Sequence, residues 1–147
     1  LYLSDCTSIS AVGLEVVLER SYRLRALSAS CHYADVTKLC PRLLQGLTTL
    51  KLRGREFVSN KALLHVALHC THLQHLSLGQ ERGGGLEIAS GLYAIAVHRP
   101  TLRTLATQPG SYFVAAAVAQ FKSVRPLVRV TGDFAPPFFH AGFDMEF

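Results

Sequence analysis

The chain has 147 residues, of which 49% are hydrophobic and 17% charged, and its mean hydropathy is +0.24. This composition predicts one folded body rather than a disordered tail, and the longest uncharged apolar stretch, residues 112–119, is far below the roughly 20 residues that span a membrane. The formal net charge of +5 and the pI near 9.3 permit contact with nucleic acid or anionic lipid without requiring it.

An apolar phrase of the form Leu-x-x-Leu-x-Leu recurs along the chain and predicts a short strand at each occurrence. Its second apolar position falls at residues 1, 27, 50, 76, 105 and 127, so that successive occurrences are separated by 26, 23, 26, 29 and 22 residues. Such periods lie in or near the range of leucine-rich repeats. The complete phrases are Leu24/Leu27/Ala29, Leu47/Leu50/Leu52, Leu73/Leu76/Leu78 and Leu102/Leu105/Thr107. Two further matches are partial: Leu1/Leu3 has only the last two apolar positions, and Val124/Leu127 has only the first two.

A second apolar register predicts a helix between successive strands. An apolar residue stands ten positions before four of the phrases, and others follow it at helical spacing, as in Leu63, Val66 and Ala67. One strand and one helix cannot bury their own apolar sides, so neighbouring repeats must stack. We therefore expect an α/β leucine-rich-repeat solenoid of about five repeats over residues 1–130. It would be a right-handed arc with short parallel strands on its concave face and helices on its convex face. The apolar residues ten positions before the phrases are Leu14, Leu63, Leu92 and Val114.

Several repeats share a more specific order of residues. Leu1–Cys6 continues into Ile9–Leu14, Val58–Leu63 continues into Val66–Leu73, and Arg99-Pro100-Thr101-Leu102 has an arginine where the pattern expects a cysteine. This order resembles the cysteine-containing leucine-rich repeats of F-box/leucine-rich-repeat proteins, over about residues 1–130. The second repeat departs from the pattern, because Cys40-Pro41-Arg42-Leu43 lies four residues too early, and the sequence leaves open whether Cys31–Gly46 forms a helix or a looser loop.

The resemblance implies a non-catalytic protein-binding module, the substrate-recognition arm of a ubiquitin-ligase receptor. In such a receptor an F-box placed earlier in the chain binds the ligase adaptor, and these residues contain no F-box. We expect the chain to be the C-terminal fragment of a longer protein. The alternative is a structural subunit built permanently into a large multi-protein assembly, such as a ribonucleoprotein particle or an organellar complex. The amino end has no charged start followed by an apolar run, so nothing in it indicates secretion. We therefore expect an intracellular location and favour the cytoplasm over an organelle.

Cysteine and histidine residues raise the question of metal binding. We expect the cysteines, Cys6 and Cys70 above all, to be buried structural thiols, with disulfides and zinc as the alternatives. His65 and His69 are four residues apart on a predicted helix, a spacing that can present two imidazoles to one metal. However, the helix should end near Cys70, and His75 should face the opposite surface. We therefore expect no metal site and no cofactor.

Catalytic patterns are also lacking. The segment Gly79–Gly85 follows a strand but lacks the Lys-Ser/Thr of a phosphate-binding loop, so an enlarged connection explains its glycines. No nucleophile, base and orienting acid stand in a recognisable order. We expect the chain not to be an enzyme.

Binding is the remaining role. Strand residues alternate between faces, so the neighbours of the buried leucines should line the concave surface. A binding patch there would suit an acidic or phosphorylated protein segment, the alternative being an ordinary solvated charge row. Nucleic acid is a less favoured partner, because the arginines are spread over every repeat and no aromatic-basic stripe is visible. The candidate residues are Tyr2, Lys51, Arg53, His75 and Gln108.

The tail, residues 131–147, departs from the repeat. It holds five of the eight phenylalanines, and Pro136-Pro137 excludes helix or ladder bonding at that point. Its aromatic residues either cap the open end of the solenoid or dock into a partner. The docking candidates are Phe138, Phe139, Phe143 and Phe147.

Overall fold

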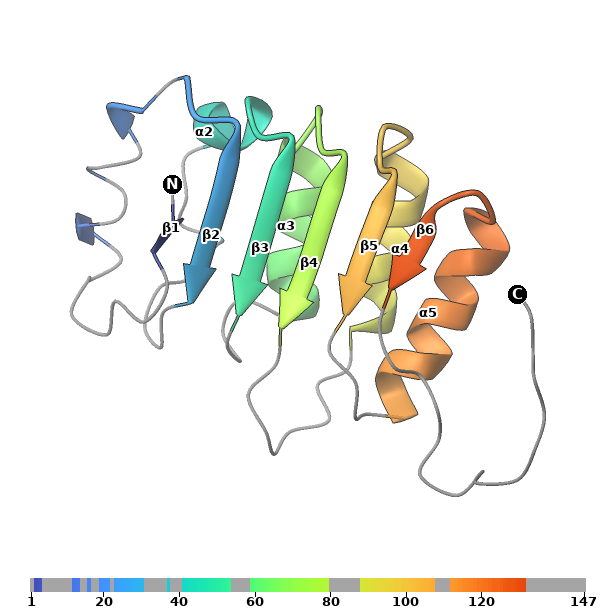
Figure 1. Ribbon diagram of the computed structural model, residues 1–147. Helices are drawn as coiled ribbons and strands as arrows, with labels where there is room; N and C mark the ends of the chain where they lie inside the picture. Colours follow the sequence, from blue (N-terminus) through green and yellow to red (C-terminus); the bar gives the residue numbers. More distant parts are fainter. Residues whose placement is uncertain are drawn as a thin grey trace.

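A computed structural model describes residues 2–3, 12–13, 16, 19–21, 23–30, 37, 41–53, 59–79, 88–107 and 112–131. Its described strands form one sheet in the order in which they occur in the sequence, and every neighbouring pair is parallel (Figure 1). The strands are β1 (Tyr2–Leu3), β2 (Ala26–Ser30), β3 (Thr49–Arg53), β4 (His75–Gly79), β5 (Thr104–Thr107) and β6 (Arg129–Thr131).

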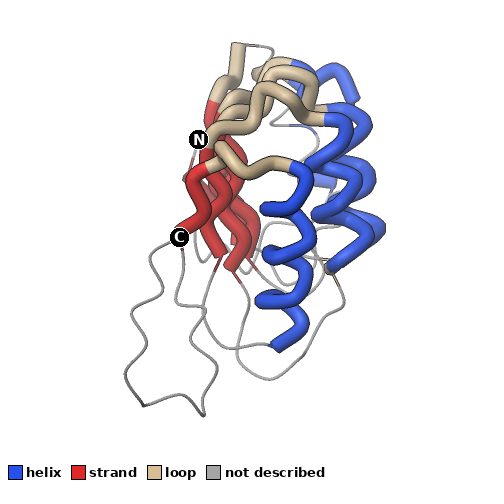
Figure 2. The backbone as a smooth tube through the Cα atoms, turned by 90° about the vertical axis from the view of Figure 1, so that its right-hand side faces the viewer, coloured by secondary structure: helices blue, strands red, loops and turns tan. Residues whose placement is uncertain are grey.

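Helices cover one face of this sheet. Figure 2 shows the strands in one layer and the helices in a second layer beside it. The helices with bounds are α2 (Pro41–Gln45), α3 (Asn60–His69), α4 (Ala89–His98) and α5 (Tyr112–Val124), and each occupies a connection between consecutive parallel strands. The predicted α/β class with parallel strands is therefore confirmed. None of the helices described is long and apolar enough to cross a membrane.

The leucine frame sets the strand register. Leu27, Leu50, Leu76 and Leu105 pair with one another across β2 to β5, and each is at most 1% exposed. At the amino end Leu3 pairs with Ala29, as the frame requires. Because side chains alternate along a strand, this register places every intervening residue on the face away from the helices.

The third and fourth helices bury the residues that the second apolar register predicts. In α3 these include Leu63, Val66 and Ala67, and in α4 the corresponding Leu92 and Ile95. The Ser59 hydroxyl accepts a hydrogen bond from the Ala62 N–H and so caps the start of α3, which ends at Cys70 as expected. The predicted helix that contains Leu14 is described only at residues 12–13, 16 and 19, where the chain is helical.

The second repeat contains a helix, which the sequence left undecided. Pro41 opens α2, a five-residue helix whose Leu43 and Leu44 face the core. Proline suits a first helical position because its missing N–H would have no partner there. Residues 31–36 and 38–40 lie outside the described residues.

The weak end of the leucine frame was assigned wrongly. Val124 is the last residue of α5, and Leu127 is 97% exposed. In the structure Leu105 pairs with Val130, and Val128 fills the buried turn position in which the other repeats have leucine. The frame fails because Val128 lies two positions before the paired Val130, whereas Leu102 lies three positions before Leu105. The tail from residue 132 onward, like Cys6, Cys31 and Cys40, lies outside the described residues.

Candidate binding surface

The face of the sheet away from the helices carries two rows of side chains, which we call the open face. Both rows are set by strand pairing, and their members are exposed or half-buried, in contrast to the buried leucines between them. Small and polar residues dominate the rows, and the larger side chains on them are Lys51, His75 and Arg129. One row contains Ser28, Lys51, Ser77, Ala106 and Thr131, and the other contains Ala26, Thr49, His75, Thr104 and Arg129.

Lys51 lies in the middle of the first row, between two serines. It pairs with Ser28 on one side and Ser77 on the other, and its side chain is exposed. Small neighbours leave space around the ammonium group, so an extended segment of another protein can approach the sheet closely here. An ammonium group in this position offers three hydrogen-bond donors to a carboxylate or phosphate.

His75 is held in place by its neighbour on the next strand. Its Nδ1 lies 2.8 Å from the Thr104 Oγ1, within hydrogen-bonding distance. Arg129 pairs with Thr104 on the far side, so the histidine and the arginine are two strands apart. The second row therefore presents an imidazole and a guanidinium on either side of a hydroxyl.

The structure brings some of the predicted site residues together. Lys51 and His75 both lie on the open face, as expected, and their role in binding stays a prediction. Tyr2 and Arg53 belong to strands whose register places them at the same face, but their side chains lie outside the described set. Gln108 and the four tail phenylalanines also lie outside it.

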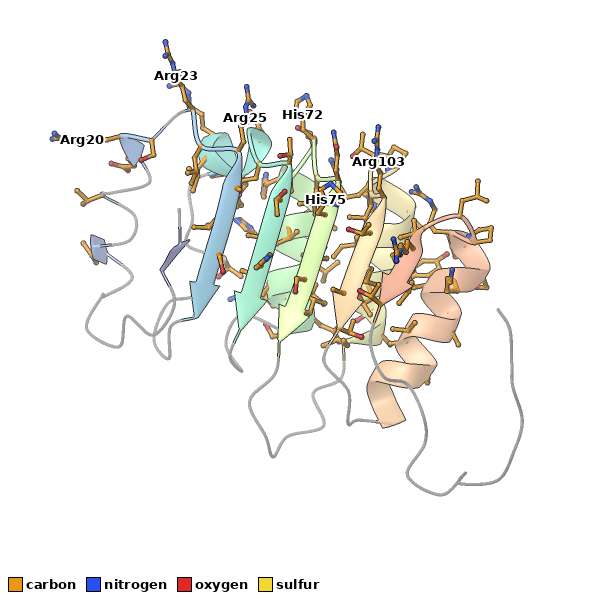
Figure 3. All side chains as sticks on the ribbon, in the orientation of Figure 1. Arg20, Arg23, Arg25, His72, His75 and Arg103 are labelled. Carbon is orange, nitrogen blue, oxygen red and sulfur yellow. The ribbon has the colours of Figure 1, made fainter. Side chains whose placement is uncertain are left out.

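Sequence reasoning missed a second group of cations. They lie along the edge where the strands begin, which we call the arginine edge, and Figure 3 shows most of them on this side of the sheet. Because parallel strands all start at the same edge, a cation just before or at the start of several strands produces a row. That recurring position was the available sequence signal. The arginine edge consists of Arg20, Arg23, Arg25, His72, Arg103 and Arg129.

The charge of the described residues is strongly one-sided. Glu19 is the only carboxylate among them, so little negative charge offsets the cations in this part of the chain. The full chain has ten carboxylates against fifteen lysines and arginines, and its net charge of +5 favours anionic partners. The lysines and arginines in the described ranges are Arg20, Arg23, Arg25, Arg42, Lys51, Arg53, Lys61, Arg99, Arg103, Lys122, Arg125 and Arg129.

Some of these cations have structural partners instead. The Arg125 guanidinium donates hydrogen bonds to the main-chain oxygens of Ala96, Arg99, Pro100 and Leu102, with N–O distances from 2.8 to 3.4 Å. It therefore closes the carboxyl end of α4, where carbonyl groups lack partners within the helix. Lys122 likewise donates to the carbonyl oxygens of Pro126 and Val128.

The histidines near Cys70 have separate environments. The rings of His65 and His69 are 4.5 Å apart on α3, whereas the His72 Nδ1 lies 2.8 Å from the Gln45 carbonyl oxygen. His75 faces the other side of the sheet. Within the described ranges no three side chains of metal-binding type come together.

Cys70 is a buried structural thiol, as the sequence predicted. It is fully buried in the core, and burial raises its pKa to about 12. A thiol with so high a pKa is protonated at neutral pH and does not act as a nucleophile. Burial, followed by the charges of His65 and Arg99, lowers the pKa of His69.

Comparison of the chain with protein-family models, with curated proteins and with solved structures found no match.

Proposed function

We propose that this chain is part of a leucine-rich-repeat solenoid that binds an acidic or phosphorylated segment of a partner protein on its open face. The observation that carries the proposal is the register of the leucines. Leu27, Leu50, Leu76 and Leu105 are all buried under the helices, so residues from separate repeats combine into one exposed surface on the other side. The sequential strand order, with a helix in the connections from β2 to β6, supports the repeat interpretation.

The chemistry of the open face favours an anionic, extended partner. Lys51, His75 and Arg129 supply donors from three different strands, and the small residues between them allow close approach. An exposed ion pair contributes only about 0–1 kcal/mol. Several such pairs must act together, so the partner segment needs several carboxylates or phosphates and must cross the strands. The proposed role is non-catalytic.

The finer proposal is that the open face selects substrates for an F-box-type ubiquitin ligase. It rests on the residue order shared by the repeats that begin at Leu1, Leu47 and Leu73. In this proposal the open face holds the substrate, and a separate part of the receptor binds the ligase adaptor. Co-purification of the protein with a stoichiometric complex that lacks the adaptor would contradict this ligase proposal. The structural-subunit alternative would then replace the ligase proposal.

The test combines charge reversal with quantitative co-purification from native cells. The variant with Lys51→Glu and Arg53→Glu should fold normally and lose the partner that the unmodified chain retains. The variant with Arg42→Glu and Lys61→Glu is the matched control, because it changes the net charge equally and both residues are exposed but lie on α2 and α3, in the helix layer. Retention of all partners by the double variant would show that the charge on the open face is merely solvated.

A further inference from the structure

The sheet topology brings the residues of the arginine edge to one side of the sheet, although β3 contributes none at its start. Arg25 directly precedes β2, Arg103 directly precedes β5, and Arg129 opens β6. Neighbouring strands are about 5 Å apart, so Arg25 and Arg103 are separated by roughly 15 Å, with Arg129 one strand further along. His72 lies between them, in the turn before β4. The row therefore spans the sheet from β2 to β6.

The main chain of this row is fixed by hydrogen bonds between repeats. The Arg25 carbonyl oxygen accepts from the N–H groups of Thr48 and Thr49 at 2.8 and 3.0 Å, and the Arg103 N–H donates to the Gln74 carbonyl oxygen at 2.8 Å. The Arg129 N–H in turn donates to the Arg103 carbonyl oxygen at 2.9 Å. The backbone positions of these arginines are therefore fixed relative to one another, which lowers the conformational cost of binding a ligand along the edge.

The side chains along the row are directed to solvent. Arg25, Arg103 and Arg129 are all exposed, and Figure 3 shows Arg25 and Arg103 extending from the upper edge of the sheet. The Arg25 Nη1 donates to the Gly46 carbonyl oxygen at 3.0 Å, which leaves its other N–H groups available. Within the described part of the chain, no contact ties down the guanidinium of Arg103 or Arg129.

The composition of the edge distinguishes between anionic partners. Proteins are held chiefly by aromatic and apolar anchors in desolvated pockets. The exposed large apolar side chains in the last turns of the described helices α3, α4 and α5 and in the turn before β6 are spread over three repeats, and none is aromatic: Leu68, Val97, Val124 and Leu127. Arginines held along one edge instead suit the phosphates of a polyanion, which guanidinium groups bind through two parallel hydrogen bonds.

From this geometry we infer that the arginine edge binds the phosphate backbone of nucleic acid, at a site that shares only Arg129 with the open face. In the sequence, the spread of arginines over every repeat argues against a nucleic-acid partner. In the folded chain, the same spread places arginines from different repeats along one edge. Tyr93 is the one exposed Phe or Tyr side chain that the structure describes, and it lies on α4 away from this edge. Without a stacking platform the edge contacts phosphates and does not distinguish bases.

The inference can be tested with the 147-residue chain and a fluorescein-labelled 20-nucleotide oligouridine. Binding is followed by anisotropy between 50 and 200 mM salt, with a labelled polyglutamate peptide as the acidic-protein probe. About five phosphate contacts to single-stranded RNA predict a log–log salt slope of roughly −3.5. The variant with Arg25→Glu and Arg103→Glu, which lie on the arginine edge alone, should bind the RNA at least about tenfold more weakly, and its slope should be smaller in magnitude by roughly 1.4.

The control variant, with Lys51→Glu and Lys61→Glu, changes the net charge equally but lies off the arginine edge. It should lose less than about threefold in RNA affinity, with circular dichroism confirming that both variants are folded. Equal losses in the two variants, or no saturable RNA binding at 50 mM salt, would overturn the inference. Tighter binding of polyglutamate than of RNA, abolished by the Arg25 and Arg103 changes, would assign the edge to an acidic protein instead.

Discussion

Replacing Gly91 by alanine should destabilise the protein, although alanine is the better helix former. Gly91 lies in the first turn of α4, directly against α3, and its N–H donates to the Asn60 Oδ1 at 2.8 Å. A Cβ atom at this position would lie 2.5 Å from the Leu63 Cβ, 3.0 Å from the Leu63 Cδ1 and 3.1 Å from the Asn60 Oδ1. The residue therefore sets how closely the two helices approach.

The magnitude follows from the size of this overlap. Ordinary contact between carbon atoms begins near 3.5 Å, so α3 and α4 would have to separate by about 1 Å. A rotamer change of Leu63 cannot relieve the overlap, because its Cβ is fixed to the backbone. Overpacking costs about 1–3 kcal/mol, and alanine gains about 1 kcal/mol over glycine in a helix. With the Asn60 hydrogen bond also weakened, Gly91→Ala should lower the free energy of unfolding by about 1–2 kcal/mol.

Urea unfolding of the unmodified chain and the variant gives this difference directly. Ser90→Ala is the matched control, because Ser90 is the adjacent helical residue and is exposed. It should change the free energy of unfolding by no more than about 0.5 kcal/mol. An increase of about 1 kcal/mol for Gly91→Ala would show that α3 and α4 are not in close contact and would refute the helix packing described here.

Three further predictions concern buried and titratable groups. Leu76→Asp should unfold the chain, because Leu76 is 1% exposed and the new carboxylate would be buried without a partner, whereas Ser77→Asp on the open face should leave the urea midpoint nearly unchanged. Similar effects of the two changes would contradict the assigned faces. Cys70 should react with a thiol reagent only on unfolding, and the free energy of unfolding should fall between about pH 9 and pH 12, since only the unfolded thiol ionises in that window. Cys70→Ala should show less of this fall; an identical pH profile would exclude the raised pKa. The pKa of His69, measured by NMR, should lie below its ordinary 6.5. Stability should therefore decrease as the pH falls through 6.5, because the unfolded chain binds that proton first, and His65→Gln should return the pKa toward 6.5.

Much of the fold follows from spacing alone. Side chains alternate along a strand, so the Leu-x-Leu spacing identified Leu50 and Leu76 as buried and Lys51 as exposed before any coordinates were considered. The helical spacing of Leu63, Val66 and Ala67 worked for the same reason. Both patterns depend on local geometry, which the sequence records directly.

The parts that were missed depend on contacts between repeats. The frame at Leu127 failed because one residue fewer separates the buried turn position from the paired residue in β6. Val128, rather than Leu127, therefore takes the buried position. The arginine edge was missed because Arg25 and Arg103 are 78 positions apart and meet one edge only after parallel strands align. Similarly, the hydrogen bond between His75 and Thr104 requires the register of two strands to be known.

The central claim is that residues from separate repeats form one surface through parallel pairing. NMR measurement of cross-strand NOEs tests it most directly. We predict contacts that link Lys51 to Ser28 on one side and to Ser77 on the other, with Leu50 linked in the same direction to Leu27 and Leu76. Contacts that run in opposite directions along neighbouring strands, as in antiparallel hairpins, would contradict the fold and the open face with it.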